Sequence, residues 1–414
     1  MSTRDGMNRR QFLKGTAAAA AAFAVPTVIR GSAIGAGNQP APSNRIVMGF
    51  VGVGGQGTGD MRGFLGFREV EGVAVCDVDK KQREGAKGFC DAKSKGCTVY
   101  TDFRELVVRP DLDVVFCATP DHWHAIITIE AMRNGKDVYC EKPECLTIRE
   151  GRKMVETARR FGRVFSGGSQ RVWGDYNYLH RVVRGGAAGK VEEVWVNVGG
   201  PSDEMLRPAM PVPEGLDWDQ WLGPAPWRPY NPGYHPYNGR WCRDYSGGNT
   251  TDWGAHGFGG ALFACNLHET GPVEICPPDG KEHKKMTVKF ANGIRMYHGG
   301  SGWGGLISVR GTEGEYSEQG PRNKSMKRDP PNIQIPNYKG SGGIFGDFLH
   351  CVRTRERPFR DIELGHRTVT VCHLINISYW LNRPLKWDPV KEEIIGDTEA
   401  SRWLDRPKRA PWRL

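Results

Sequence analysis

The 414-residue chain is predicted to be an α/β protein whose N-terminal half binds a dinucleotide on a parallel sheet. The first observation is a buried-strand pattern at 45–51 that leads directly into the glycine loop 52–57, which has the spacing G-x-G-x-x-G. The second is Asp77, twenty positions beyond the loop, where this fold places a carboxylate for the ribose hydroxyls. The third is the alternation of strand and helix patterns as far as residue 165, which favours a doubly wound sheet.

The glycine loop is the predicted phosphate site. Its three glycines are Gly52, Gly54 and Gly57, and the helix that follows would aim its first amides at a pyrophosphate. A tight turn without ligand is the alternative, but the strand before the loop and the acid after it favour a nucleotide. A P-loop is excluded because no Lys-Ser or Lys-Thr pair follows the glycines. The Asp77 carboxylate would repel a 2′-phosphate, so NAD is favoured over NADP, and two nearby lysines keep this preference moderate.

Three more strands are predicted at 112–118, 137–140 and 163–165, with helical spacing between them. Ligands of such a sheet bind outside the carboxyl ends of its strands. The residues that follow each strand are therefore candidates for the site, and Thr119 and Pro120 are the first of them.

Two histidines, His122 and His124, come directly after this turn. They could be metal ligands, but side chains at i and i+2 on a loop make a poor pair without acidic partners. The eleven cysteines contain no C-x-x-C pair and show no ligand spacing. We therefore predict no metal, and we place both histidines in a loop on the nicotinamide side, with plain packing as the alternative.

Residues 1–36 are predicted to be a twin-arginine signal peptide. Arg9 and Arg10 precede an Ala-rich apolar stretch at 17–24, which is the layout of such a signal; a short amphipathic helix is the alternative. Residues 37–44 are predicted to be a linker. The twin-arginine export machinery carries folded proteins, so the cofactor and reduced cysteines would be in place before the protein reaches the periplasm or another exported location.

Charge and hydropathy exclude two other classes. The formal net charge is +10, but five basic residues against one acid put +4 of it in the leader, and the rest is scattered. No nucleic-acid-binding motif is present. No apolar run after the leader approaches the roughly 20 residues that span a bilayer. We expect no nucleic-acid partner and no membrane segment in the mature protein.

Further motifs carry a family resemblance. They are Thr119-Pro120 with His124, Cys140-Glu141-Lys142-Pro143, Gly168-Ser169-Gln170-Arg171, residues 247–256 with Asp252 and His256, and Leu385-Lys386-Trp387-Asp388-Pro389. Together with the glycine loop they resemble the Gfo/Idh/MocA oxidoreductases, and the resemblance extends from Arg45 to the end of the chain.

The resemblance implies a Rossmann domain over 45–168 and a C-terminal α/β domain over 169–414 with a large open, mostly antiparallel sheet. It implies NAD(P)-dependent chemistry on a carbohydrate hydroxyl, and a homodimer or homotetramer formed through the open sheet. The catalytic residues carried over by motif are Lys142, Asp252 and His256. The cofactor-binding residues are Gly52, Gly54, Gly57, Asp77, Thr119, Pro120, His124, Glu141 and Lys142.

The chemistry of the three catalytic candidates agrees with these roles. Removing hydride from an alcohol carbon requires removal of the hydroxyl proton, and His256 is suited to accept it. Asp252, one helical turn earlier, could hold that ring. Lys142 could stabilise the alkoxide, with a pKa lowered by burial and by the oxidised nicotinamide. The alternatives are a capping acid with a surface histidine, and a solvated lysine.

Residues 201–247 are rich in proline and aromatic residues. We expect these rings to pack against the chain's own open sheet or a neighbouring subunit, in preference to stacking on sugar rings. The polar candidates for reading substrate hydroxyls are Gln170, Arg171, Tyr176, Arg240 and Asn249.

The sequence therefore predicts an exported NAD-dependent oxidoreductase of sugars, polyols or glycosides that retains its cofactor, because no dependable pool of free NAD exists outside the cytoplasm. Two alternatives stay open. One is a glycosidase that oxidises a ring hydroxyl transiently and returns the hydride after the glycosidic bond is cleaved. The other is a cofactor-bound binding protein without turnover.

Overall fold

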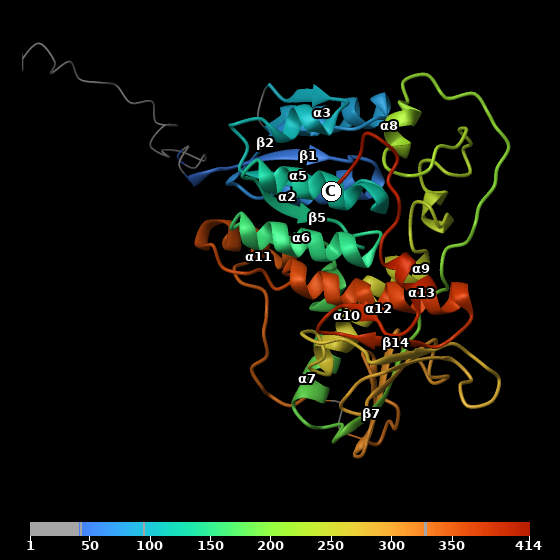
Figure 1. The fold of residues 1–414 in the computed structure, drawn as a ribbon. Coiled ribbons are helices and arrows are strands. Elements are labelled where there is room, and N and C mark those ends of the chain that lie inside the picture. The colour runs from blue at the N-terminus through green and yellow to red at the C-terminus, as the bar shows by residue number, and fades with distance from the viewer. Residues whose placement is uncertain (1–40, 42–43, 94–95, 327–328) are drawn as a thin grey trace, which may run out of the picture. The chain divides into compact units, whose positions relative to one another are not determined.

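Strands in the described part of the chain form two sheets, one of six strands and one of nine (Figure 1). The computed structural model describes residues 41, 44–93, 96–326 and 329–414. The predicted signal peptide lies outside the described residues, as does the predicted linker apart from positions 41 and 44.

The six-stranded sheet is parallel, with the order β3-β2-β1-β4-β5-β6. Its strands are β1 (Ile46–Val51), β2 (Val70–Cys76), β3 (Thr98–Tyr100), β4 (Val114–Cys117), β5 (Asp137–Cys140) and β6 (Phe165–Gly167). The order reverses between β1 and β4, which is where a doubly wound sheet opens a crevice for its ligand. The predicted Rossmann topology is confirmed.

Helices cover both faces of the parallel sheet. One face packs against α2 (Gly55–Leu65), α3 (Lys80–Lys93) and α11 (Gly343–Thr354). The other packs against α4 (Phe103–Val107), α5 (Asp121–Arg133) and α6 (Ile148–Arg160). The start of α6 is fixed by a capping box, in which the side chains of Thr147 and Glu150 each accept a backbone N–H at the helix end.

The nine-stranded sheet has the order β13-β12-β11-β7-β10-β9-β8-β14-β15. Its strands are β7 (Val191–Val196), β8 (Glu274–Cys276), β9 (Met286–Lys289), β10 (Arg295–His298), β11 (Ile307–Gly311), β12 (Gly314–Ser317), β13 (Gly320–Pro321), β14 (Leu385–Asp388) and β15 (Glu393–Ile394). Among the described strands of this second sheet, only β10 and β7 pair in parallel. The sheet is therefore mixed and mostly antiparallel, as predicted.

Helices from the C-terminal half pack against this second sheet. They are α7 (Asn177–Arg184), α10 (Gly254–Ala264), α12 (Ile362–Leu381) and α13 (Thr398–Ser401). The long helix α12 also lies against α6, and so joins the second sheet to the parallel one (Figure 1). Short elements complete the set: η3 (Gln170–Val172), α8 (Trp218–Leu222), η4 (Asn238–Trp241), α9 (Asn249–Asp252) and η5 (Arg402–Leu404). No described helix combines the length and apolar character needed to cross a bilayer.

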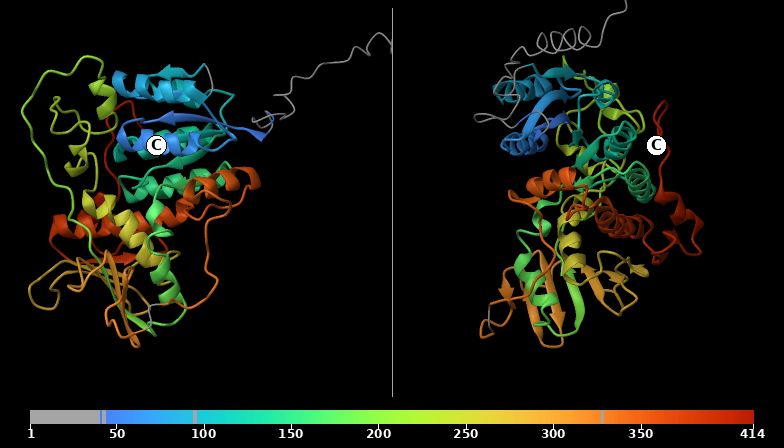
Figure 2. Two further views of the ribbon diagram at one scale, coloured as in Figure 1. Left: turned by 180° about the vertical axis from the view of Figure 1, so that it is seen from behind. Right: turned by 90° about the vertical axis from the view of Figure 1, so that its left-hand side faces the viewer.

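Residues 201–247, the aromatic segment, run beside the parallel sheet and its helices (Figure 2, left). Several of its rings form a buried cluster of their own, with Trp218 and Trp221 stacked at 4.6 Å between ring centroids. The indole N–H of Trp123 on α5 donates to the carbonyl oxygen of Trp221 at 3.0 Å. The expectation that the rings pack is thus confirmed. The surface that they cover, however, belongs to the nucleotide half of the same chain and not to the open sheet.

Candidate active site

A cleft of about 760 Å³ lies at the carboxyl ends of the parallel strands. The glycine loop after β1, Thr119 and Pro120 after β4, and Lys142 after β5 line it on one side. Residues between 220 and 256 line the other side. The cleft therefore occupies the position at which the strand order reverses, where this topology binds its ligands.

The three glycines of the loop each meet a different steric demand. Gly52 has a φ of +78°, and a side chain there would collide with the backbone of Thr119. A Cβ on Gly57 would collide with the carbonyl oxygen of Gly52. A Cβ on Gly54 would meet no atom within 4 Å beyond its chain neighbours, so its backbone borders open cleft. A pyrophosphate site of this kind needs a tight turn at the first glycine, room for the phosphates to approach the backbone at the second, and close packing of the helix at the third. The three residues meet these conditions and fit a dinucleotide.

Asp77 lies beside this cradle at the end of β2. Its Oδ2 accepts the backbone N–H of Val53 at 2.9 Å, and its Oδ1 accepts that of Asp79 at 2.9 Å. Burial raises the pKa of this carboxyl to about 6, against the lowering effect of the two backbone amides. The side chain is therefore fixed in place before any ribose binds, and near neutral pH it is ionised.

Lys142 and Asp252 meet in the cleft although 110 positions separate them. The Lys142 Nζ donates to Asp252 Oδ1 at 2.6 Å, and Arg240 donates to Asp252 Oδ2 at 3.0 Å. Burial lowers the pKa of Lys142, but Glu141 and Asp252 outweigh burial and the net shift is upward. The sequence-based expectation of a lowered lysine pKa is therefore wrong, because it left out the neighbouring acidic groups. Lys142 is an ammonium group here.

His256 lines the same cleft from the first turn of α10. Burial, and then the Lys142 charge, lower the pKa of His256 to about 3, so the ring is neutral. Its Nδ1 is buried without a hydrogen-bond partner among the described residues. Asp252 ends the short helix α9, and its carboxylate is directed to Lys142 and Arg240. The expectation that Asp252 holds the histidine is thus replaced by a contact with the lysine.

Glu141 supports Lys142 from behind. It is 4% exposed, and its Oε1 accepts the side-chain amide of Gln170 at 2.7 Å. Burial, followed by the neighbouring Asp60 carboxyl on α2, raises the pKa of Glu141 well above its usual value. Two carboxyls in so small a volume cannot both ionise cheaply, so this pair is suited to share a proton.

Three of the predicted site residues lie away from the cleft. Tyr176 is 3% exposed within the apolar core of the second sheet. Asn249 begins α9 and lies against Gly199. His124 is buried, with its ring nitrogens beside two backbone carbonyls. The remaining predicted residues line the cleft, namely Gly52, Gly54, Gly57, Asp77, Thr119, Pro120, Glu141, Lys142, Gln170, Arg171, Arg240, Asp252 and His256; their roles stay predictions.

The loop that was expected to hold His122 and His124 is the first turn of α5. Pro120 precedes the helix and Asp121 stands in its first turn, and both are favoured at a helix start. His122 packs against the aromatic segment, and its Nε2–H donates to the carbonyl oxygen of Trp221 at 2.9 Å. Both histidines are buried, and neither lines the cleft.

Sequence reasoning missed the part of the aromatic segment that reaches the cleft. Trp221, His235 and Tyr237 line it, and the Arg240 guanidinium stacks 3.7 Å from the Tyr237 ring centroid. The segment's composition was the available signal, but composition does not say which rings face the core and which face the cleft.

Comparison with known proteins gives three family matches. Residues 46–169 match a model described as the oxidoreductase family NAD-binding Rossmann fold. Residues 195–414 match the C-terminal α/β domain of the same oxidoreductase family. Residues 6–26 match the twin-arginine translocation pathway signal sequence, which marks the chain for export.

Curated relatives and a solved structure extend these matches. A glycosyl hydrolase family 109 protein of Shewanella pealeana is 31% identical over 170 residues, and an α-N-acetylgalactosaminidase of Shewanella oneidensis is 31% identical over 171 residues. In both cases the matched part is 37% of this chain and 37% of the relative, so the chain spans just over a third of their length. The WlbA dehydrogenase from Bordetella pertussis, solved with NADH and UDP-GlcNAcA, has a TM-score of 0.59 at 15% identity, covering 83% of this chain and 99% of that one.

Proposed function

The chain belongs to the Gfo/Idh/MocA oxidoreductase family, and we propose that it transfers hydride between NAD and a hydroxyl-bearing carbon of a sugar, polyol or glycoside after export. One observation carries the proposal. A charged lysine paired with a carboxylate and a neutral histidine line the same cleft as a glycine loop shaped for a pyrophosphate. These are the groups that alcohol oxidation needs.

The cofactor would be held by the nucleotide end of the cleft. The backbone of Gly52, Gly54 and Gly57 would receive the pyrophosphate, and the fixed carboxylate of Asp77 would accept from the ribose hydroxyls. Bound NAD supplies the hydride acceptor. The chain's own residues handle the proton and the charge.

The proton of the substrate hydroxyl would pass to His256. A ring with a pKa of about 3 is a weak base, but the hydroxyl proton becomes strongly acidic as the carbon loses hydride, so a weak base suffices in a concerted step. Lys142 would donate a hydrogen bond to the oxygen as negative charge develops on it. Asp252 would keep the ammonium group aimed at that point, because it already binds the Lys142 Nζ at 2.6 Å.

The aromatic segment supports the proposal that the cofactor is retained. Its residues line the cleft opposite the glycine loop, and its inner rings form a buried cluster. Opening the cleft would expose part of this cluster, which costs about 25 cal/mol for each Å² of apolar surface. The protein would therefore leave the cytoplasm with NAD in place and release it slowly.

A glycosidase that uses the same site is the second candidate, and the curated relatives named for glycoside hydrolysis favour it. In that cycle the hydride taken from a ring carbon returns to it after the glycosidic bond is cleaved, so no net NADH forms. Lys142 and His256 would serve both reactions. A cofactor-bound binding protein is the third candidate, and it requires that turnover be absent.

The test is a panel of free sugars, polyols and aryl glycosides given to the purified protein with and without added NAD. Net NADH formation supports the dehydrogenase. Release of the aryl group without net NADH supports the glycosidase, and NAD retained without turnover on any compound supports the binding protein. His256→Asn should abolish turnover while bound NAD persists. His350→Asn on α11, with 39% of its side chain exposed, is the matched control. Equal turnover by both variants would show that His256 is not a catalytic residue.

A further inference from the structure

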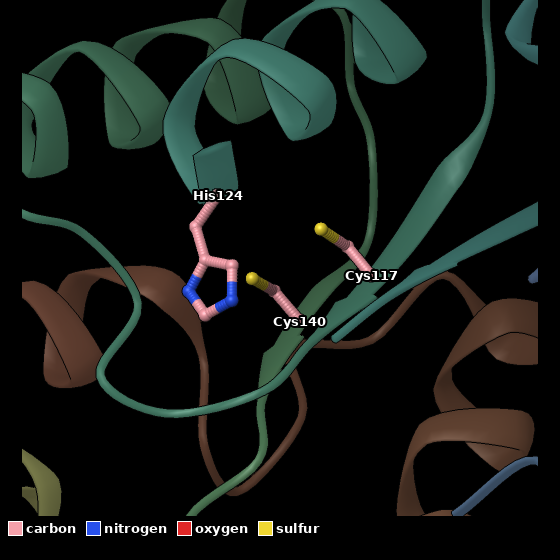
Figure 3. Close-up of side chains that lie close together, drawn as sticks. All are labelled: Cys117, His124 and Cys140. Carbon is pink, nitrogen blue, oxygen red and sulfur yellow. The ribbon is translucent and has the colours of Figure 1, made fainter. Parts of the chain in front are cut away.

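Beneath the cleft, two thiols and an imidazole point toward one another (Figure 3). Cys117 ends β4, Cys140 ends β5, and the two are directly opposed in the strand register. His124 reaches them from the first turn of α5. One ligand atom from each residue lies within 4.8 Å of the other two, and all three residues are at most 1% exposed.

The hydrogen bonding of His124 fixes its charge. Its Nδ1 lies 2.8 Å from the carbonyl oxygen of Pro143, and its Nε2 lies 2.7 Å from that of Thr119. A carbonyl oxygen only accepts, so both nitrogens must carry hydrogen, and the ring is an imidazolium. No lone pair is then left for a metal ion, and a buried cation requires a nearby negative charge.

Cys117 is placed to supply that charge. Burial opposes ionisation, but the Cys140 thiol, the His124 ring and Thr119 outweigh burial and lower the pKa of Cys117 to about 6. Burial, and then the same contact with Cys117, raises the pKa of Cys140 well above its usual value. One member of the pair is therefore the ionised acceptor and the other the protonated donor. Asp121 also interacts with His124, and burial raises the pKa of its carboxyl.

We propose that Cys117 and Cys140 are a redox-active dithiol, in which the His124 cation keeps Cys117 as a thiolate and hydroperoxides oxidise the pair to a disulfide. The thiolate sulfur attacks one peroxide oxygen, the O–O bond breaks and hydroxide leaves, giving a sulfenic acid at Cys117. The Cys140 thiol then loses its proton and attacks that sulfur. The S–O bond breaks, the S–S bond forms and water leaves. Overall, two thiols and one hydrogen peroxide give one disulfide and two waters.

The strand geometry admits this bond. Directly opposed residues on neighbouring strands are about 4.7–4.9 Å apart, within the Cα separation of about 4.4–6.8 Å that disulfides adopt. The pair also lies next to the cleft, because Ala118, Thr119 and Glu141 line its floor. The Cys117 Sγ is 3.4 Å from Thr119 Oγ1. A peroxide, which is close to water in size, would enter from there, and bound NAD would block its path.

Other cysteines of the chain provide internal references. Cys372 is equally buried, but burial raises the pKa of its thiol well above the usual value. Cys90 and Cys97 form a second hydrogen-bonded pair that could also oxidise. The test therefore uses the C90S/C97S double variant as its background, which leaves nine of the eleven cysteines.

The experiment exposes this background protein to hydrogen peroxide near neutral pH, with NAD bound and with NAD removed. The protein is then denatured, its free thiols are alkylated, and mass spectrometry counts them. We expect the NAD-free sample to fall from nine free thiols to seven, with a mapped Cys117–Cys140 disulfide that a thiol reductant reverses. Cys117 should react about tenfold faster than Cys372, because thiolate is the reactive form. We also expect the NAD-bound sample to lose its free Cys117 and Cys140 thiols more slowly. Cys117 and Cys140 remaining free when Cys372 has begun to react would overturn the proposal.

Two further measurements separate a reactive pair from a merely buried one. Adding C140S should stop the reaction at a sulfenic acid on Cys117, which dimedone traps. The rate of Cys117 oxidation in the background protein should fall to half its plateau near pH 6. The role of His124 would be contradicted if no dimedone adduct formed, or if the rate of Cys117 oxidation followed the pKa of an ordinary thiol. Neither measurement needs a His124 variant.

Discussion

The two ends of the cleft are built in opposite ways. The nucleotide end, made of the glycine loop and Asp77, comes from one continuous stretch, residues 52–77, and backbone amides hold its carboxylate. The charged end brings Lys142 to Asp252, 110 positions away in the sequence, beside Arg240 and His256, and ion pairs join Lys142 and Arg240 to Asp252. One end depends on the shape of the backbone and the other on the balance of charge.

This difference teaches what each end tolerates. The nucleotide end has no room for a side chain at two of its glycines, so it should fail sterically and lose the cofactor. The charged end has room but holds a partly buried lysine against two carboxylates. It should fail electrostatically and lose turnover while the cofactor stays. Substitutions at the two ends should therefore separate binding from chemistry.

The largest effect is expected at the charged end. Lys142→Met removes the ammonium group proposed to stabilise the developing alkoxide, and Asp252 keeps its pairing with Arg240. We expect turnover to fall about a thousandfold, the size of effect seen for loss of a transition-state donor. Bound NAD, measured after acid release, should be unchanged. Lys153→Met on α6, with 44% of its side chain exposed, is the control and should keep full activity. Loss of NAD from the Lys142 variant would show that the two ends are not separable.

The next effect is expected at the nucleotide end. Gly57→Ala drives a methyl group into the carbonyl oxygen of Gly52. We expect NAD affinity to fall by about 3 kcal/mol, roughly 150-fold, the upper range for overpacking. Gly59→Ala, two residues along the same helix and with no atom near its added methyl, should bind NAD normally and be slightly more stable. Calorimetric titration of NAD into the stripped proteins measures both. Equal affinities would mean that the loop adjusts and that its glycines are not a fixed cradle.

The same difference explains what the sequence could predict. The nucleotide end was predictable because strand, loop and acid are local and each has a spacing signature. At the charged end, the resemblance supplied Lys142, Asp252 and His256, but not their pairing. Helical spacing suggested that Asp252 holds His256, whereas the carboxylate accepts from Lys142 and Arg240.

Errors at other positions have the same origin. Tyr176 has the hydroxyl expected of a residue that binds sugars, yet it lies inside the core of the second sheet. His124 and its two cysteines come from three separate elements, and no local pattern shows that they meet. The parallel sheet was predictable from the alternation of strands and helices, apart from its short edge strand β3, which was not predicted. Which face of the aromatic segment meets the cleft depends on long-range packing that composition does not encode.

A smaller effect is expected from Asp77→Asn at the nucleotide end. The amide keeps the size of the side chain but loses the charge that strengthens its hydrogen bonds to the ribose hydroxyls. A hydrogen bond to a charged group contributes about 1.5–3 kcal/mol, so NAD affinity should fall about 10-fold and by no more than about 150-fold. Turnover at saturating NAD should be close to wild type, which a titration of rate against NAD would measure. If saturating NAD did not restore turnover, Asp77 would contribute to the chemical step as well as to NAD binding, and the two ends would not have separate roles.

The smallest effect, and the finest distinction, is in the pH dependence. At the charged end, His256 has a pKa of about 3 and stays neutral above it, while the raised pKa of Lys142 keeps that group charged. Neither group titrates between pH 5 and 9, so turnover at saturating NAD should vary less than about twofold across this range. At the nucleotide end, Asp77 has a pKa of about 6 and is protonated below it. NAD affinity should therefore decline as pH falls through 6, and in Asp77→Asn this decline should be absent. A bell-shaped turnover profile with a limb near pH 7 would instead mean that His256 titrates in the working enzyme and that substrate binding changes the balance of charge around it.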